Sequence, residues 1–386
     1  MIEGMSTLGM HVLRKITFLV LVSLLCLLMA EGFVRLFYGG QILLFPRFHS
    51  PAKYGEYTIR RLLPNASFLH TSVDGRWRFI TNSKGFRDVR EYGYPKSNGV
   101  YRVFCVGDSH TQGFECDQDR TYAAVIGRYL AGRGVVAEVI NAGVSGFGTA
   151  EELVLVEQEL VRYAPDVIVV GFFANDFDDN IKSGLFQVKD GNLVPVKYKH
   201  VPASRILKVV NGNALLRWLS QHSCLYSGIF NAAWEWGKGS LLTQQEKQMA
   251  SEFAVSQGDV DASLRYQKEA LCLLLLQRLY AVCERNQIQL VLLDVPQLGE
   301  ETGGFKSSIP EHLNSAFKER SHIMITSDEV LSEYRHVTPL FLEHGQRHIS
   351  EITHLLLGVS VARQLHESWS SRKKAGALNL ICPLGK

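Results

Sequence analysis

Val106-Gly107-Asp108-Ser109-His110-Thr111 follows the largely apolar run Tyr101 to Cys105. Such a run is typical of a buried strand, so the sequence places a serine where a strand gives way to a loop. A serine in that position can act as a nucleophile. The segment is not the Gly-x-Ser-x-Gly elbow of the α/β-hydrolases, because Gly107-Asp108-Ser109-His110 is followed by Thr111 and not by a second glycine. That class of enzyme is therefore disfavoured.

Apolar strands alternate with amphipathic helices from Tyr101 onward. This alternation predicts an α/β fold with a parallel sheet covered on both faces. In such a sheet ligands bind beyond the carboxyl ends of the strands, so the residues that follow Val106, Ile140 and Phe173 should meet in one crevice. The predicted strands are Tyr101 to Val106, Val135 to Ile140, Val167 to Phe173 and Ile288 to Val295, with a short run Ile323 to Thr326. The predicted helices are Thr121 to Ala131, Glu151 to Arg162, Leu264 to Asn286, Glu311 to Arg320 and Glu351 to Ser368.

Two further segments stand after these strands, Asn141-Ala142-Gly143-Val144-Ser145-Gly146 and Gly171-Phe172-Phe173-Ala174-Asn175-Asp176. Together with the Ser109 segment they resemble, in type, order and spacing, the first three sequence blocks of the SGNH/GDSL hydrolases. The resemblance covers roughly Tyr101 to Ala362. It implies a three-layer α/β/α fold with a central parallel sheet in flavodoxin-like order, acyl chemistry on esters, and no cofactor.

The resemblance also implies an oxyanion hole made of the Ser109 and Gly146 backbone N–H groups and the Asn175 side-chain amide. Gly146 is preferred to Gly143 because the family's glycine follows a short Asn-x-x-x-x segment, which Asn141 to Ser145 matches. Taken alone, each glycine is better explained by a turn with positive φ, and Asn175-Asp176 is equally explained by a loop cap. Asp108 and Asp176 are interpreted as loop-ordering residues.

The general base should be a histidine on the loop that enters the last helix. His348 fits best, because the run His348-Ile349-Ser350-Glu351 resembles the family's closing block. His354 lies about two turns further on, within the predicted helix, and His344 lies earlier in the loop. Both remain alternatives to His348.

The chain departs from the family at its usual Asp-x-x-His motif, because position 345 is Gly345. Glu343 could replace the missing carboxylate if the loop bends, and Glu351-x-x-His354 is a shifted alternative. A backbone carbonyl could also orient the imidazole and leave a Ser109–His348 dyad. Losing an orienting carboxylate can cost about 10⁴ in kcat, so a weakened or inactive enzyme is a further alternative.

The amino-terminal region carries an uncharged, mostly apolar run, Ile16 to Ala30, which Phe33 to Tyr38 extend past Glu31. The whole is roughly long enough to span a hydrocarbon core. Because Arg14 and Lys15 precede it, we expect residues 1–15 in the cytoplasm and the remainder outside it. The absence of a good cleavage site favours an uncleaved anchor at 16–38 over a signal peptide. The expected location is a bacterial cytoplasmic membrane, crossed once, with a periplasmic catalytic domain.

The other boundaries along the chain are predicted from its composition and from the spacing of its apolar residues. Residues 39–100 lack helical periodicity and predict an irregular lead-in with short extended runs such as Trp77 to Thr81. The hydrolase domain is expected at 101–370, with an insertion at about 180–262 that opens with a hairpin at Asp190-Gly191, and a loosely held tail at 371–386.

Composition excludes several other functions. The chain has 386 residues, 46% hydrophobic and 20% charged, with a net charge of +3, which is too mild to indicate nucleic-acid binding. Its 7 cysteines have no C-x-x-C spacing, so no metal site is expected. The acidic run Asp178-Asp179-Asn180 is better explained as a solvated loop than as a cation site. Trp218, Trp234 and Trp236 could stack on sugar rings but fit core positions better.

The function implied is a serine esterase or O-acyltransferase in which His348 draws the proton from Ser109. The membrane anchor, lead-in and insertion resemble bacterial members of the family that act on envelope carbohydrate, so O-acetyl groups are the expected substrate. A lipid esterase or lysophospholipase is the alternative within the same class. A catalytically impaired carbohydrate-binding or envelope-assembly protein is the alternative outside it, motivated by Gly345. The sequence does not indicate an oligomeric state.

Overall fold

The computed structural model describes residues 2–46, 49–202, 204–252, 260–299, 304–344 and 347–381. Its centre is a five-stranded parallel sheet with the order β14-β11-β7-β5-β6. In chain order this is 2-1-3-4-5, the flavodoxin-like order that was predicted. The strands are β5 (Tyr101–Gly107), β6 (Ala137–Asn141), β7 (Val167–Phe172), β11 (Gln289–Asp294) and β14 (Ile323–Ile325).

Alternate residues of each strand pack on opposite faces of the sheet, which gives two separate cores. Phe104 and Ile168 belong to one core, whereas Val103 and Val169 belong to the other. The first core is covered by α4 (Thr149–Gln158), α9 (Val260–Arg285) and α10 (Asn314–Lys318). The second is covered by α3 (Tyr122–Gly132) and α12 (Glu351–Ile381). The predicted three-layer α/β/α architecture is confirmed.

The lead-in is more regular than the predicted irregular segment with short extended runs, although residues 81–100 form no helix or strand. It forms two antiparallel pairs, β1 (His49–Tyr54) with β2 (Tyr57–Leu62) and β3 (Ser67–Thr71) with β4 (Arg76–Ile80). These strands are only five or six residues long, so their alternation gives a weak pattern in the sequence. They are held because their apolar side chains join the first core of the central sheet. The extended run near Trp77 to Thr81 corresponds to β4.

The insertion contains the predicted hairpin and a set of helices. Strands β8 (Phe186–Lys189) and β9 (Asn192–Pro195) pair around Asp190-Gly191, and β10 (Lys199–His200) pairs with β2 of the lead-in. Three helices follow, α6 (Ser204–Gly212), α7 (Ala214–His222) and α8 (Cys224–Glu252). The short elements of the domain are α2 (Ser109–Gln112), α5 (Asp176–Ser183), α11 (Ser327–Leu331), β12 (Gln297–Leu298) and β13 (Phe305–Lys306), with 3₁₀ turns at Gly39–Gln41, Gln118–Arg120, Leu160–Tyr163, Glu311–Leu313 and Ser332–Tyr334.

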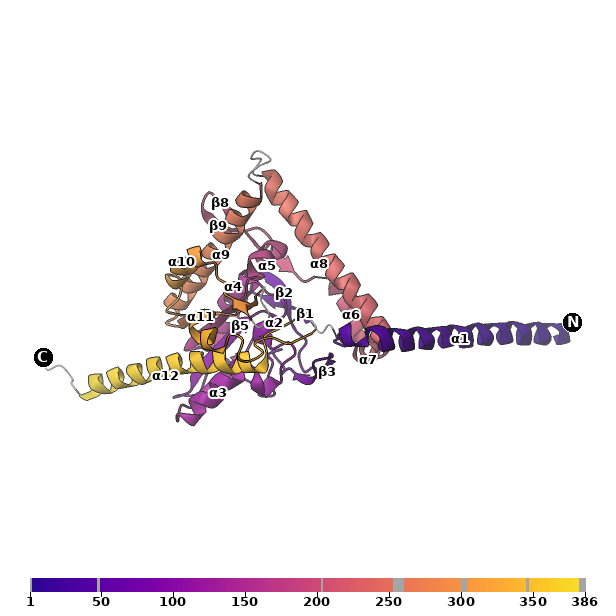
Figure 1. Cartoon of the computed structure of the whole chain (residues 1–386), viewed down its shortest axis with the longest axis horizontal. Helices are drawn as coiled ribbons and strands as arrows, with labels where there is room; N and C mark the ends of the chain where they lie inside the picture. Colours follow the sequence, from indigo (N-terminus) through magenta and orange to yellow (C-terminus); the bar gives the residue numbers. More distant parts are fainter. Residues whose placement is uncertain are drawn as a thin grey trace.

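The two terminal helices extend from opposite sides of the domain (Figure 1). Helix α1 (Ile2–Tyr38) includes the predicted span 16–38, and within Gly9–Gln41 an 18-residue window has a mean hydropathy of 2.3 with none of that window buried. By length and composition it is able to cross a membrane. At the other end α12 continues to Ile381, so residues 371–381 of the predicted tail are helical. Residues 382–386 lie outside the described residues.

Candidate active site

Ser109 stands where the sequence placed it, directly after β5 and at the start of α2. Asp108 caps this short helix, because its carboxylate accepts a hydrogen bond from the His110 N–H at 2.8 Å. The helix ends at Gly113, whose φ of 80° turns the chain back on itself. The nucleophile candidate therefore sits on a tight turn at the carboxyl edge of the sheet, beside a cavity of about 780 Å³ that both Ser109 and His348 line.

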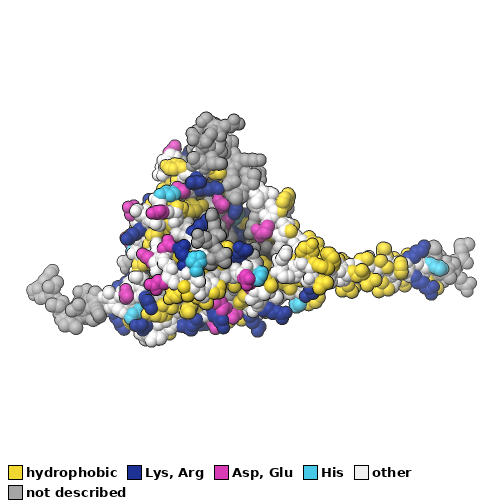
Figure 2. All heavy atoms as spheres, viewed as in Figure 1, with side chains coloured by type: hydrophobic (Ala, Val, Ile, Leu, Met, Phe, Trp, Pro, Cys, Tyr) yellow, Lys and Arg dark blue, Asp and Glu magenta, His cyan; other side chains and the backbone are white. Residues whose placement is uncertain are grey.

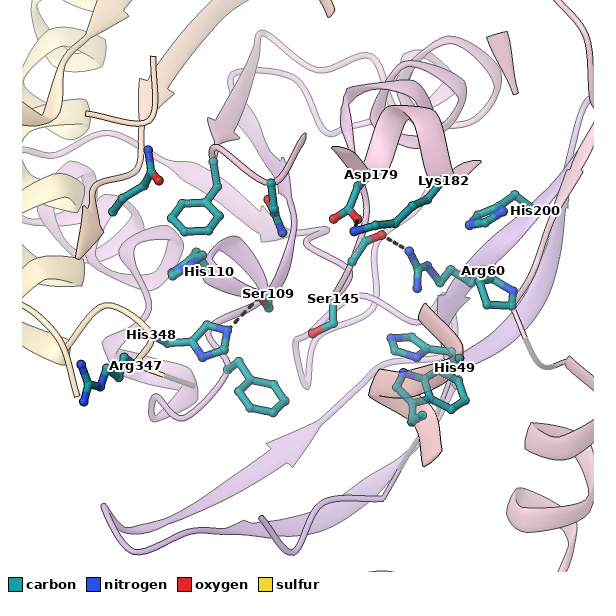
Figure 3. A pocket seen from close by; sticks show the side chains of 18 of the residues that line it. His49, Arg60, Ser109, His110, Ser145, Asp179, Lys182, His200, Arg347 and His348 are labelled. Carbon is teal, nitrogen blue, oxygen red and sulfur yellow. Dashed lines mark hydrogen bonds and ion pairs between the residues drawn. The ribbon is translucent and has the colours of Figure 1, made fainter. Parts of the chain in front are cut away.

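His348 and Ser109 point toward one another across this cavity (Figure 3), with 2.9 Å between Nε2 of the imidazole and Oγ of the serine. His348 is 5% exposed and packs against the rings of His110 and Phe114, with centroids 4.7 and 4.8 Å away. For Nε2 to accept the hydroxyl proton, the neutral imidazole must carry its own hydrogen on Nδ1. What faces Nδ1 therefore decides the tautomer.

The carboxylate beside Nδ1 is Glu115, which the sequence analysis did not single out. Its Oε2 lies 3.9 Å from Nδ1 of His348, and its Oε1 lies 3.7 Å from Nε2 of His70. Burial raises the pKa of Glu115 to about 7, and the nearby Asp74 adds to the rise. Glu115 reaches this place because it follows the turn at Gly113 and itself has a φ of 59°. The nucleophile and this carboxylate are only six residues apart in sequence.

Glu343, the carboxylate predicted from the sequence, is exposed, and Gly345 lies outside the described residues. The other predicted pair is engaged elsewhere. Glu351 forms an ion pair with Arg120, and its carboxylate accepts from the Asp117 N–H at 3.3 Å. The local sequence signal for Glu115 is its position just after the Ser109 segment, whereas the carboxylate of the family's usual Asp-x-x-His motif lies beside the histidine.

The two alternative histidines lie apart from Ser109. His354 is fully buried, and its Nδ1 accepts from the Tyr122 N–H at 3.3 Å, which ties α12 to the start of α3. Burial lowers the pKa of His354 to about 3. His344 is exposed and lies 3.1 Å from Asp74. Of the three candidates, His348 is the one whose imidazole bonds to Ser109 in the described part of the chain.

The predicted oxyanion donors lie around the same cavity, which Gly146 and Asn175 both line. Asn175 Nδ2 donates to the Asp108 carboxylate at 3.2 Å, which orients the amide, and a primary amide has a second hydrogen to donate. Gly146 has a φ of 73°, so glycine is required there. Gly143 lies against the backbone of α2, and its N–H already donates to Asn141 Oδ1 at 3.0 Å. These observations favour Gly146 over Gly143 as a donor.

The half of the cavity beyond Ser145 is polar (Figure 3). Arg60 donates to the Gly146 carbonyl, and Nη2 lies 3.7 Å from the Glu151 carboxylate. Lys182 and Asp179 form an ion pair at 2.7 Å. The acidic run singled out in the sequence is thus held by cations, since Asp178 also pairs with Lys268 at 2.8 Å.

The opposite side of the cavity is apolar and comes from the insertion. Ile206 of α6 and Phe230, Ala233, Trp234 and Gly237 of α8 line it. Among the three tryptophans of the insertion, Trp234 borders the cavity, whereas Trp218 and Trp236 are 54 and 77% exposed. The cavity therefore joins a catalytic pair, a polar region and an apolar wall.

Residues 105–248 match the GDSL-like lipase/acylhydrolase family. This segment of the chain is similar to that family. This confirms the predicted resemblance to the SGNH/GDSL family, whose members include esterases and acylhydrolases. No curated protein matches the chain in sequence.

Solved structures similar to this chain share little sequence with it. TesA is 14% identical over 68% of this chain and 97% of its own, with a TM-score of 0.32. The acetyl xylan esterase AlAXEase is 12% identical over 69% of this chain and 98% of its own, with a TM-score of 0.34. A two-domain esterase, CEX, active on acetylated mannans, is 11% identical over 69% of this chain and 49% of its own, with a TM-score of 0.34.

Proposed function

We propose that this GDSL-like domain cleaves acyl esters with Ser109 as nucleophile and His348 as general base. The proposal is carried by the 2.9 Å contact between Ser109 Oγ and His348 Nε2 at the edge of a cavity. A hydroxyl is a weak nucleophile unless a base takes its proton as it attacks, and a histidine at hydrogen-bonding distance supplies that base.

The reaction would proceed through an acyl-enzyme. Ser109 Oγ attacks the ester carbonyl carbon while its proton passes to His348 Nε2, and the carbonyl oxygen becomes an oxyanion. The backbone N–H groups of Ser109 and Gly146 and the Asn175 amide would hold that oxyanion. When the tetrahedral intermediate collapses, the alkoxide leaving group takes the proton from His348. Water then attacks the acyl-enzyme, with His348 again as base. A sugar hydroxyl in place of water would make the enzyme an O-acyltransferase.

Glu115 is proposed as the positioning residue for His348. An anion 3.9 Å from Nδ1 favours the tautomer with hydrogen on Nδ1 and stabilises the imidazolium that forms during attack. This carboxylate would do the work of the aspartate that Gly345 replaces, so the glycine is not in itself an argument for an inactive scaffold. The role predicted for Glu343 stays a prediction.

The polar half of the cavity supports carbohydrate O-acetyl groups as the substrate. Arg60, Asp179, Lys182 and His200 offer charged and hydrogen-bonding groups, and Trp234 offers an aromatic ring. Sugars are bound by such combinations of polar groups and ring faces. The apolar wall of α8 is the observation that favours the lipid esterase as the second candidate. In either case Arg14 and Lys15 before the span favour an extracytoplasmic domain.

A serine-directed fluorophosphonate tests the proposal. It should label wild-type protein at Ser109, and neither Ser109→Ala nor His348→Ala should be labelled. Thermal unfolding of both variants serves as the control for folding. Absence of an adduct on folded wild-type protein would count against the proposal. Rates on p-nitrophenyl esters then separate the substrates, because preference for acetyl over long acyl groups supports carbohydrate esters and the reverse supports lipids.

A further inference from the structure

Helix α1 is bonded directly to the insertion through Glu31. The Glu31 carboxylate accepts from Ser223 Oγ at 2.8 Å and from the backbone N–H groups of Cys224 and Leu225 at 2.9 Å. The backbone N–H groups at the start of a helix have no partner within the helix. Glu31 of α1 therefore caps the start of α8. Arg35 adds an ion pair with Glu31 at 2.8 Å.

Arg35 also donates to the His222 carbonyl at 2.6 Å, the last residue of α7. The corner between α7 and α8 is therefore fastened to α1 by hydrogen bonds from both sides. The Glu31 carboxylate and the Arg35 guanidinium both form hydrogen bonds with backbone groups of this corner. These bonds fix the position of the corner along α1.

The length of the span places that corner at the membrane boundary. The uncharged run Ile16 to Ala30 extends about 22 Å as a helix, which is shorter than a hydrocarbon core of about 30 Å. A core that ends at Glu31, the first charged residue after this run, would begin about 20 residues earlier, near His11, and the long side chains of Arg14 and Lys15 can extend from there to the headgroups. The start of α8, which is bonded to Glu31, would then lie at the level of the lipid headgroups.

The helices joined at this corner expose large apolar side chains. We define the α6–α8 face by five residues that are 54 to 77% exposed, namely Val209, Leu215, Trp218, Ile229 and Trp236. Figure 2 shows hydrophobic side chains continuing from α1 onto the adjoining part of the domain. Exposed apolar groups of this kind mark a contact surface, and tryptophan is enriched at the membrane–water interface. Lys208 and Arg217, exposed on the same helices, suit anionic headgroups.

Helix α8 has two apolar sides with different surroundings. Phe230, Ala233, Trp234 and Gly237 follow a spacing of three and four residues and line the cavity. Ile229 and Trp236, seven residues apart, are exposed. The side of α8 that lines the cavity faces the active site. The exposed side, with Ile229 and Trp236, must therefore face a different partner.

We propose that the α6–α8 face rests on the surface of the bilayer that α1 crosses. The chain is then held to the membrane at two places, by the span and by this face, and α8 separates the catalytic cavity from the lipid. The occupant is a lipid surface because the face continues from a helix of membrane-spanning composition and is fastened to it at headgroup depth.

Quenching of tryptophan fluorescence by brominated lipid tests the proposal on the full chain. The protein is placed in nanodiscs of phosphatidylcholine and phosphatidylglycerol, with or without bromine in the acyl chains, and the quenched fraction of the emission is measured. Trp218→Phe and Trp236→Phe should each lose a large part of the quenched emission, and together they should lose most of it. Trp369→Phe is the matched control, because Trp369 lies on α12 at the other end of the domain, and it should lose none.

Equal losses in all three variants, or no quenching in wild-type protein, would overturn the proposal. Emission from Trp218 and Trp236 that responds to protein concentration instead of to brominated lipid would overturn it as well, because the face would then join two copies of the chain. The measurement does not depend on catalysis, so Ser109→Ala should give the wild-type result whether or not the proposed esterase activity is correct.

Discussion

Replacing Glu115 by glutamine should lower kcat by about 10²- to 10³-fold. The substitution keeps the shape of the side chain and removes its charge. At 3.9 Å, a charge pair with an effective dielectric constant of 20 interacts by about 4 kcal/mol, which sets the upper limit for stabilisation of the His348 imidazolium. Since about 1.4 kcal/mol is tenfold in rate, this limit corresponds to about 10³. The glutamine dipole retains a small part of that effect. KM should change little, because Glu115 does not border the cavity.

The assay is steady-state hydrolysis of p-nitrophenyl acetate from pH 5 to 9. Burial raises the pKa of Glu115 to about 7, so the wild-type carboxylate is largely ionised at pH 8 and largely protonated at pH 6. The wild-type kcat should therefore fall below pH 7. In Glu115→Gln the acidic limb should move to lower pH, because the anion that stabilises the imidazolium is gone. A purely structural role for Glu115 would leave the position of that limb unchanged.

Glu343→Gln is the control, because Glu343 is the exposed carboxylate that the sequence predicted. It should retain wild-type kcat. The proposed role of Glu115 is refuted if folded Glu115→Gln keeps the wild-type kcat at pH 8. If Glu343→Gln loses activity while Glu115→Gln does not, the orienting carboxylate is Glu343.

Three further predictions concern the oxyanion donor, the second buried histidine and a buried acid. Asn175→Ala should lower kcat by about 10² to 10³ with little change in KM, measured by steady-state kinetics. His354→Leu should keep the activity per folded molecule but lower the free energy of unfolding by about 1 to 3 kcal/mol, measured with urea, because the Tyr122 N–H loses its acceptor. Burial raises the pKa of Glu151 to about 7, above its usual 4.5 in the unfolded chain, so the native state binds the extra proton and wild-type stability should fall as pH rises from 4.5 to 7. Glu151→Gln should remove about 2 kcal/mol of that fall, measured by urea unfolding at pH 5 and 7.5.

The parallel sheet could be predicted because its strands are buried on both faces. All six residues of β7 are buried, so the strand is a continuous apolar run in the sequence. The lead-in strands lack this signal. In β4, for example, Arg76 and Arg78 alternate with buried Trp77 and Phe79, and five residues give too short a pattern to separate a strand from a loop. Such strands form because they gain partners in the folded domain, which the local sequence does not show.

The sequence predicted those residues of the candidate site whose positions follow from the order of the strands and helices along the chain. Ser109 and Asn175 follow neighbouring parallel strands and therefore share one edge of the sheet, and His348 precedes the last helix of the same domain. The orienting carboxylate could not be found in this way, because its place depends on a local turn instead of on strand order. Gly113 and Glu115 both have positive φ, and for a glutamate this conformation is uncommon.

That uncommon conformation connects the nucleophile to the carboxylate in a single turn. The Phe114 N–H donates to the Ser109 carbonyl at 2.9 Å, which closes the turn, and the Phe114 ring packs on His348. Glu115 then points to the side of the imidazole opposite Ser109. A non-glycine residue with positive φ persists only when its surroundings hold it there, and such residues cluster at active sites. In this chain the six residues after the serine would supply both the group that attacks and the charge that holds its base, whereas the more usual arrangement draws that charge from the loop of the histidine.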